Sequence, residues 1–171
     1  MRIVRVVTAF MLCVFVCAGC AKEGGDFLDY QNNIKSASVT WSIGDREYSG
    51  KIEYGQEDTV VTALSPVEIE GTIITYTDEG CTATVGGVCL PLPDNMGREV
   101  YRIVHSLSLE KSEMKGAGEG SGTETAVRFE SALYGSVTEY NIVYNDDKMP
   151  ATAKITWDDG EMYVRYDGFD G

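Results

Sequence analysis

The chain has 171 residues and a formal net charge of −13, with 27 acidic and 14 basic side chains. Such an acidic surface repels nucleic acid and anionic lipid headgroups, so the composition excludes both as electrostatic partners. The length fits one domain behind an N-terminal leader.

Residues 1–19 have the features of a bacterial signal peptide. Arg2 and Arg5 give a positively charged start, and residues 6–19 carry no charge. This apolar run is too short to cross a hydrocarbon core of about 30 Å as a helix, whereas its length suits a signal peptide that is later removed. Ordinary cleavage after Ala21 and retention as a membrane anchor remain alternatives.

The residues around Cys20 indicate lipid attachment. Ala18, Gly19 and Cys20 resemble a lipobox, in which small residues precede the cysteine that is acylated, although Cys17 stands where an aliphatic residue is usual. Two acyl signals, palmitate among them, are enough for stable anchoring. We therefore expect an extracytoplasmic lipoprotein of the bacterial cell envelope, anchored to the membrane through Cys20. Cleavage before Cys20 would remove two arginines and leave 152 residues with a net charge of −15.

Residues 20–33 are expected to form the lipidated N-terminus and a polar spacer, and residues 34–171 the folded domain. The first half of this domain has a period of two residues, which is typical of strands. In residues 35–43 apolar side chains alternate with serine and threonine, so one face of the strand is apolar. Further strands are expected at residues 48–54, 59–64, 72–77, 81–85 and 88–92.

One principal helix is expected to begin near Gly97 and to end near Ser108. Four apolar residues recur there at i, i+3, i+4 and i+7, the spacing of one face of a helix. This narrow stripe consists of Val100, Ile103, Val104 and Leu107.

The chain after the helix returns to strands. Residues 112–124 contain four glycines and are expected to form a loop. Strands are expected at residues 126–133, 137–144, 151–157 and 162–166. A sheet of at least seven antiparallel strands must curl or be covered on its apolar face. The expected fold class is therefore mainly β, with a curved antiparallel sheet and one helix on its concave face.

Several scattered segments carry a resemblance to a known family. They are residues 48–52, 65–66 with Gly71, Ile74 and Tyr76, the helix that follows 91–93, residues 148–150 and residues 166–169. In this order they resemble the LolA/LolB-like lipoprotein-carrier superfamily, including its Gram-positive anchored lipoproteins, over roughly residues 34–169. The resemblance implies a LolA-like half-open barrel whose concavity is covered by helical segments and holds acyl chains.

No residue pattern indicates catalysis, a cofactor or a bound metal. His105 is the only histidine and lies nearly opposite the apolar stripe, so we expect it to face water, which disfavours a catalytic triad or a zinc site. Residues 115–122 lack the ending of a phosphate-binding loop. The acidic turns at 146–147 and 158–159 lack the alternating ligands of a calcium loop. The chain is expected not to be an enzyme.

Cys81 and Cys89 would remain in the mature chain beside the lipidated Cys20. A bridge requires Cα atoms within about 7 Å, and the expected compartment permits disulfides. A three-residue loop at 84–86 would place the two cysteines opposite each other. A two-residue turn at 86–87 would offset them by about 10 Å, and an uninterrupted strand would separate them further. A disulfide is therefore one of several open alternatives.

Residues that would share the apolar faces of the sheet and helix are the candidate ligand-facing residues. They are Trp41, Ile52, Ile74, Tyr76, Val100, Ile103, Val104, Leu107, Tyr140, Ile142 and Trp157. As ordinary core and cross-strand residues they would only stabilise the sheet, whereas lining an open concavity they would contact an apolar guest.

Two functions remain after these exclusions. The first is a membrane-anchored, non-catalytic bacterial lipoprotein that binds an apolar ligand, a lipid or a lipopeptide, in the half-barrel concavity. The alternative is a protein-interaction module that docks an envelope protein, such as a cell-wall enzyme.

Overall fold

The structure is a computed structural model that describes residues 27–93, 97–119 and 124–171. The expected signal peptide, Cys20 and the first part of the expected spacer lie outside the described residues. Within the described ranges the chain forms one antiparallel sheet of eleven strands, one α-helix and two short 3₁₀ helices. The expected mainly β fold class is confirmed.

The elements have the following bounds. The strands are β1 (Ser36–Ile43), β2 (Arg46–Tyr54), β3 (Asp58–Ser65), β4 (Ile73–Thr77), β5 (Gly80–Val85), β6 (Val88–Pro91), β7 (Met114–Glu119), β8 (Thr125–Leu133), β9 (Ser136–Tyr144), β10 (Pro150–Trp157) and β11 (Gly160–Asp170). The helices are η1 (Asp29–Asn32), α2 (Arg98–Ser106) and η2 (Lys111–Glu113).

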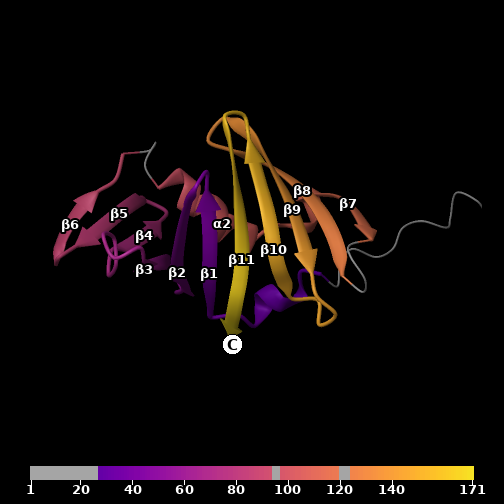
Figure 1. The fold of residues 1–171 in the computed structure, drawn as a ribbon, viewed down its shortest axis with the longest axis horizontal. Helices are drawn as coiled ribbons and strands as arrows, with labels where there is room; N and C mark the ends of the chain where they lie inside the picture. Colours follow the sequence, from indigo (N-terminus) through magenta and orange to yellow (C-terminus); the bar gives the residue numbers. More distant parts are fainter. Residues whose placement is uncertain (1–26, 94–96, 120–123) are drawn as a thin grey trace, which may run out of the picture.

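The sheet is a meander whose first and last strands meet in its middle. Its strand order is β6-β5-β4-β3-β2-β1-β11-β10-β9-β8-β7, so β1 pairs with both β2 and β11. The two edges, β6 and β7, are consecutive along the chain, and α2 lies in the connection between them (Figure 1). The sheet curves around this helix without closing, which gives the expected half-open barrel.

Strand β7 corrects one expectation. Residues 112–124 were expected to form a loop, but Met114–Glu119 pairs with β8, for example Ala117 with Val127. The period-two signal requires one buried face, and Gly116, Ala117 and Gly118 on this edge strand are exposed. The sequence of β7 therefore lacks the alternation that identified the inner strands.

The folded part also begins before residue 34. Tyr30 in η1 is buried and packs against Tyr144 and Phe169, with ring centroids 6.2 and 6.3 Å away. Gln31 donates a hydrogen bond from Nε2 to the carbonyl oxygen of Leu109. Residues that were assigned to the polar spacer thus close one end of the half-barrel.

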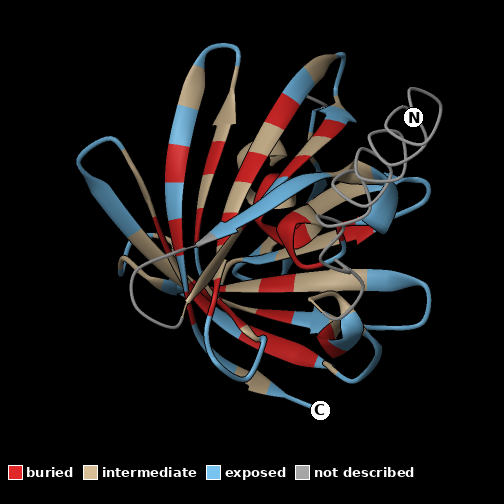
Figure 2. Ribbon diagram, turned by 90° about the vertical axis from the view of Figure 1, so that its right-hand side faces the viewer, coloured by how far each residue is buried: buried red, intermediate tan, exposed pale blue. Residues whose placement is uncertain are grey.

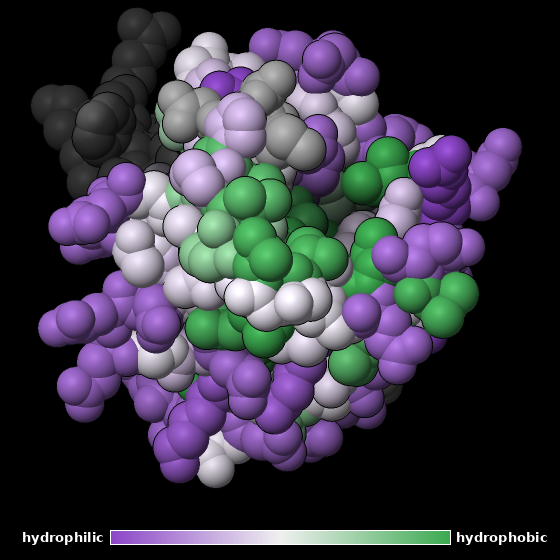
Figure 3. Space-filling view, turned by 90° about the vertical axis from the view of Figure 1, so that its left-hand side faces the viewer, coloured by the Kyte–Doolittle hydropathy of each residue, from purple (hydrophilic) through white to green (hydrophobic). Residues whose placement is uncertain are grey.

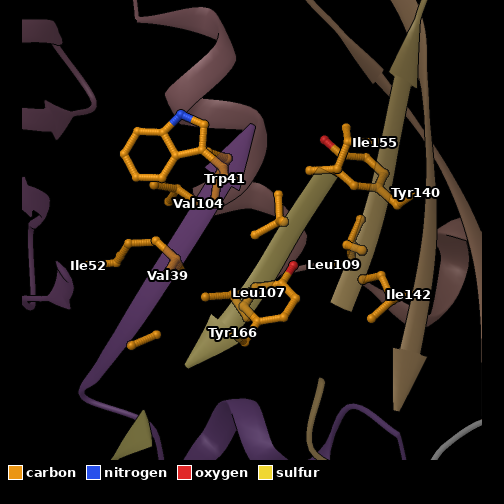
Figure 4. Packing of buried hydrophobic residues seen from close by; sticks show 14 of the residues in the cluster. Val39, Trp41, Ile52, Val104, Leu107, Leu109, Tyr140, Ile142, Ile155 and Tyr166 are labelled. Atoms are coloured by element: carbon orange, nitrogen blue, oxygen red, sulfur yellow. The ribbon is translucent and has the colours of Figure 1, made fainter. Parts of the chain in front are cut away.

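The core lies between the concave face of the sheet and α2. Buried residues alternate with exposed ones along the strands in Figure 2, as expected for a sheet with one covered face. One row of cross-strand neighbours, fully buried throughout, runs Met162–Ile155–Tyr140–Phe129. Leu107 and Leu109, which follow the last turn of α2, belong to the same buried cluster, in which Figure 4 labels them together with Ile155 and Tyr140.

Gly50 allows a tryptophan to lie across the sheet. A Cβ at this position would stand 2.9 Å from the carbonyl oxygen of Thr62 and 3.2 Å from the indole of Trp41. Only a residue without a side chain accommodates such contacts, and Trp41 consequently reaches over β2, where it stacks on Tyr48.

The interior position of α2 predicts a large stability effect for Ile103→Ala. The Ile103 side chain is fully buried, so its truncation should lower the free energy of unfolding by about 2–5 kcal/mol through lost burial and the cavity left behind. Val137→Ala, on the exposed side of β9, is the control and should change it by less than about 0.5 kcal/mol. Urea unfolding followed by circular dichroism measures both. Equal effects of the two substitutions would contradict a helix buried in the concavity.

Candidate functional site

The structure brings all of the candidate ligand-facing residues into one hydrophobic cluster. Eight of them are buried: Trp41, Ile52, Tyr76, Ile103, Val104, Leu107, Tyr140 and Ile142. Three are partly buried and pack against the others: Ile74, Val100 and Trp157. The convergence expected from the periodicities of sheet and helix is therefore present.

The centre of the half-barrel is filled by these side chains. Ile52, Ile103, Tyr140 and Ile142 have 0% exposure. A side chain with no accessible surface lines no cavity large enough for water, and native cores are packed to this density. An apolar guest could reach these four residues only if α2 moved. The space beneath the helix is thus core, and accessible apolar surface must be sought elsewhere on the concave face.

Such a surface lies on the wing formed by β3–β6. One row of cross-strand neighbours leads outward from β2 through the wing: Ile52, Val61, Ile74, Ala83 and Leu90. Exposure is 0% at Ile52, 3% at Val61, 8% at Ala83 and 54% at Leu90. The side chains of this row are therefore covered as far as β5 and exposed on the edge strand β6.

Two further side chains extend this surface. Val85 and Val88 form a cross-strand pair on the same face as Leu90 and are more than half exposed. Figure 3, which views the molecule from the β6 side, shows hydrophobic side chains gathered in the centre of this face with hydrophilic ones around them. We call Val85, Val88 and Leu90, with Ile74 and Ala83 behind them, the apolar wing.

A cleft of about 1030 Å³ opens where the wing approaches the helix. The turns β2–β3 and β4–β5 form its walls, and Tyr76 and Tyr101 contribute aromatic surface. Tyr76 donates a hydrogen bond to the carbonyl oxygen of Gly97, which fixes the wing to the start of α2. Four acidic residues line the cleft: Glu57, Asp58, Asp78 and Glu79. This acidic mouth disfavours the entry of an anionic group.

His105 does not face water as expected. Its Nε2 lies 3.0 Å from Ser131 Oγ and 3.3 Å from Glu113 Oε1, and its ring packs edge-on against Tyr140. The helix is covered on a second side by η2, which follows it after a short connection, and by β8, which is more distant in sequence. The apolar stripe of α2 indicates only the side of the helix that packs against the sheet beneath it. The expectation that His105 faces water was therefore wrong.

Arg102 is a buried residue that the sequence did not single out. It is 4% exposed, and its guanidinium carbon lies 4.5 Å from the centre of the Trp157 ring. Its Nε lies 3.4 Å from Thr138 Oγ1, which is a long hydrogen bond. The residue stands beside the apolar stripe of α2, and an arginine there gives no sequence signal that distinguishes it from one on a solvated face.

The hydroxyls of Tyr54 and Tyr140 are two of the four buried tyrosine hydroxyls that have no hydrogen-bond partner in the described part of the chain. Burial raises the pKa of both phenols well above the ordinary value, so they remain neutral.

The two cysteines of the folded domain are free. Gly86 and Gly87 both have positive φ and form a two-residue turn, so Thr84, not Cys81, is opposite Cys89. Cys81 is three residues further along and on the other face of the hairpin. Of the three geometries considered, the structure has the one that offsets the sulfurs, so the candidate disulfide is not formed.

The described ranges contain neither a metal-binding cluster nor a membrane-spanning helix. No group of three or more histidine, cysteine, aspartate or glutamate side chains is arranged there to hold a metal ion. No helix in the same part of the chain is long and apolar enough to cross a membrane.

Comparison with known proteins gives matches at the level of the fold. No protein-family model and no curated protein matches the chain. A crystal structure of an uncharacterized conserved protein from Thermus thermophilus aligns with a TM-score of 0.50 and 16% identity over 87% of each chain. A LolA superfamily protein from Nitrosomonas europaea aligns at 0.44 and 10% identity, over 85% of this chain and 92% of that one. The Mycobacterium tuberculosis lipoprotein LppX aligns at 0.44 and 9%, over 86% and 96%.

At these low sequence identities the matches bear on the fold alone. The Thermus protein shares the architecture of this chain, and the half-open barrel with a helix on its concave face that was expected from the sequence is confirmed. The resemblance to the LolA/LolB-like superfamily stays a prediction. Whether the chain is of the Gram-positive anchored type stays a prediction.

Glu113 should make stability depend on pH. Burial raises the pKa of this carboxyl, but hydrogen bonds from Ser131 and the backbone of Glu110, together with His105, outweigh burial and hold the pKa below its ordinary value. A carboxyl whose pKa is lowered by folding stabilises the protein above its unfolded-state pKa of about 4.3, and this contribution is lost as the pH falls through the folded value.

Glu113→Gln should therefore lower the free energy of unfolding at pH 7 and have a much smaller effect at pH 3. Urea unfolding at both pH values tests this, with the exposed Glu68→Gln as the control that changes little at either. A Glu113→Gln effect that is equal at pH 7 and pH 3 would contradict the assigned contacts.

Proposed function

We propose that the protein is a membrane-anchored, non-catalytic bacterial lipoprotein that binds an apolar ligand, the acyl chain of a lipid or lipopeptide, on the apolar wing. The observation that carries the proposal is the outward row from Ile52 to Leu90, in which exposure rises from 0% to 54% without a change from apolar to polar residues. Strands that face water on one side normally carry polar residues there. An apolar row that continues past its cover is therefore a surface for a ligand.

The acidic composition supports this interpretation. A protein with a net charge of −13 has ample polar residues for a solvated surface, and contiguous exposed apolar patches on such proteins usually mark interaction sites. An extended hydrocarbon chain suits the wing, because Val85, Val88 and Leu90 offer a shallow apolar strip along an exposed edge.

The anchor would hold the folded domain near a membrane. Residues 21–26 separate Cys20 from Phe27, where the described structure begins, and at about 3.5 Å per residue they span at most about 25 Å. An acyl group on Cys20 would thus keep the η1 end of the half-barrel close to the bilayer. The acidic domain would be held near a surface that its charge alone would avoid.

A second candidate function uses the same wing. All four residues of β6 are exposed, and β6 is an edge of the sheet with one side unpaired. An exposed edge strand can pair with an extended segment of another protein. Docking of an envelope protein on β6 is therefore the alternative, and ligand binding distinguishes the two.

The binding test uses the lipid-free mature chain, residues 20–171 with Cys20→Ser. Titration with a fluorescent fatty acid should give saturable binding, and Leu90→Asp should weaken it by about tenfold because a carboxylate replaces apolar surface in the strip. Val137→Asp is the matched control, since Val137 is similarly exposed but on the convex face of β9. Circular dichroism checks that each variant is folded.

Two results would reject acyl-chain binding on the wing. One is a folded wild-type chain that shows no saturable binding, which would leave the protein-docking alternative. The other is equal weakening by Leu90→Asp and Val137→Asp, which would place the binding surface elsewhere.

The anchor is tested separately in a bacterial host. Cells grown with labelled palmitate should incorporate the label into the wild-type chain and not into Cys20→Ala, because the acylated thiol is then missing. Label that persists in Cys20→Ala would reject lipid attachment at this residue.

A further inference from the structure

Strand β6 has one open edge, and Cys89 supplies backbone groups to it. A two-residue turn joins β5 to β6, so the residues that flank the turn, Val85 and Val88, form a hydrogen-bonded pair. Such pairs alternate along an antiparallel ladder, and the bond from the Leu92 N–H to the Cys81 carbonyl oxygen lies in the same phase. Cys89 therefore directs both its N–H and its carbonyl oxygen away from β5, toward the open side of the sheet (Figure 1).

The position of Pro91 agrees with this orientation. Pro91 lies two residues after Cys89, so its backbone nitrogen also faces the open side. Proline has no N–H to donate, and within sheets it is found on edge strands with that nitrogen facing solvent. Val88 and Leu90 direct their backbone groups to β5 instead. Cys89 is thus the one residue of β6 that offers both a donor and an acceptor on the open side.

The wing is uncharged on both of its faces. Strands β4, β5 and β6 contain no charged residue, and the convex row Ile73, Thr84 and Cys89 is as free of charge as the concave one. The opposite edge of the sheet, β7, contains Lys115. Charged side chains, lysine above all, normally protect exposed edges from pairing. Strand β6 lacks this protection, and a ligand on the concave face would cover neither its edge nor its convex side.

A second copy of the chain fits this edge. Each copy has a net charge of −13, so two copies repel each other over most of their surfaces. Residues 80–93 contain no charge, and two such segments can meet without this repulsion. We infer that β6 pairs in antiparallel fashion with β6 of a second copy, about a two-fold axis at Cys89, so that the two sheets continue as one.

The side chains of β6 are self-complementary in this register. Each Cys89 N–H donates to the Cys89 carbonyl oxygen of the other copy, and each Val88 lies opposite Leu90 of the other copy. Val88 and Leu90 are apolar, more than half exposed and on the concave face, so apolar side chains meet there and the two apolar wings become continuous. The inference does not rest on the proposed function, because the pairing requires no ligand.

The size of the contact decides how it must be measured. An edge of four residues buries far less than the about 1,200–2,000 Å² of a stable interface, so the dimer is expected to exchange with the monomer in dilute solution. A covalent trap detects such a dimer. In a hydrogen-bonded antiparallel pair the two Cys89 Cα atoms would stand about 5.5 Å apart, which is within the range of a disulfide.

The test uses the lipid-free mature chain with Cys20→Ser and Cys81→Ser, in which Cys89 is the remaining thiol. Oxidation with diamide should produce the disulfide-linked dimer at least about tenfold faster than in a control chain whose sole thiol is introduced by Val137→Cys, because paired strands hold the Cys89 thiols at a high effective concentration. Val137 is the matched position, since it is similarly exposed but lies on the convex face of β9. Non-reducing gel electrophoresis measures both rates.

Two further sets of variants test the pairing itself. Val88→Lys should remove the rate advantage of Cys89, because it places a charge opposite an apolar side chain at the paired edge, whereas Val137→Lys should retain it. Val88→Cys and Leu90→Cys chains, each also carrying Cys89→Ser, should cross-link with each other in preference to themselves.

The outcomes separate the dimer from the proposed function. A Cys89 rate equal to that of the Val137→Cys chain overturns the dimer and leaves β6 open to a different protein. A rate advantage that survives Val88→Lys, or Val88→Cys chains that prefer themselves, overturns pairing in this register. Should Val88→Lys not fold by circular dichroism, the mixed chains decide the question. A Cys89 advantage without saturable fatty-acid binding supports the dimer and overturns the proposed function, and the reverse result overturns the dimer alone.

Discussion

The fold depends on one topological constraint: β6 and β7 are consecutive along the chain but lie at opposite edges of the same sheet. Their connection must therefore cross the whole sheet, and apolar residues on one stripe make it cross on the concave face as α2. Ile103 and Val104 then fill the space between the two halves of the sheet, and the first and last strands, β1 and β11, complete the floor beneath them. A single short helix thereby serves as connection, cover and core.

The cover that this crossing provides is uneven. On the β7–β11 side, η2 and β8 lie beside the helix, and His105 forms hydrogen bonds with Ser131 and Glu113 there. On the β3–β6 side, contact with the helix passes through Tyr76 and Gly97, and beyond it the apolar row continues to an exposed Leu90. The filled centre and the open wing are thus two consequences of one placement, and neither requires the helix to move.

The sequence predicted the elements whose apolar side chains recur with a regular period. Period-two alternation identified β1 and β10, and the stripe from Val100 to Leu107 identified α2 to within two residues at each end. Edge strand β7 was missed because glycines and exposure remove the alternation there. The surroundings of His105 and Arg102 were missed because they come from β8, β9 and β10, and helical periodicity carries no information on which distant strand covers a helix. The candidate residues were placed together correctly, but their burial depended on how completely one helix fills the concavity.

A shallow apolar strip alone binds weakly. Full burial of a valine or leucine side chain contributes about 1.5–3 kcal/mol, and Val85, Val88 and Leu90 are already about half covered, so each has only part of this left to gain. Association costs several kcal/mol in lost freedom, which consumes much of the gain from the acyl chain. On the proposed function, such weak binding would let an acyl chain be taken up by the wing and released again.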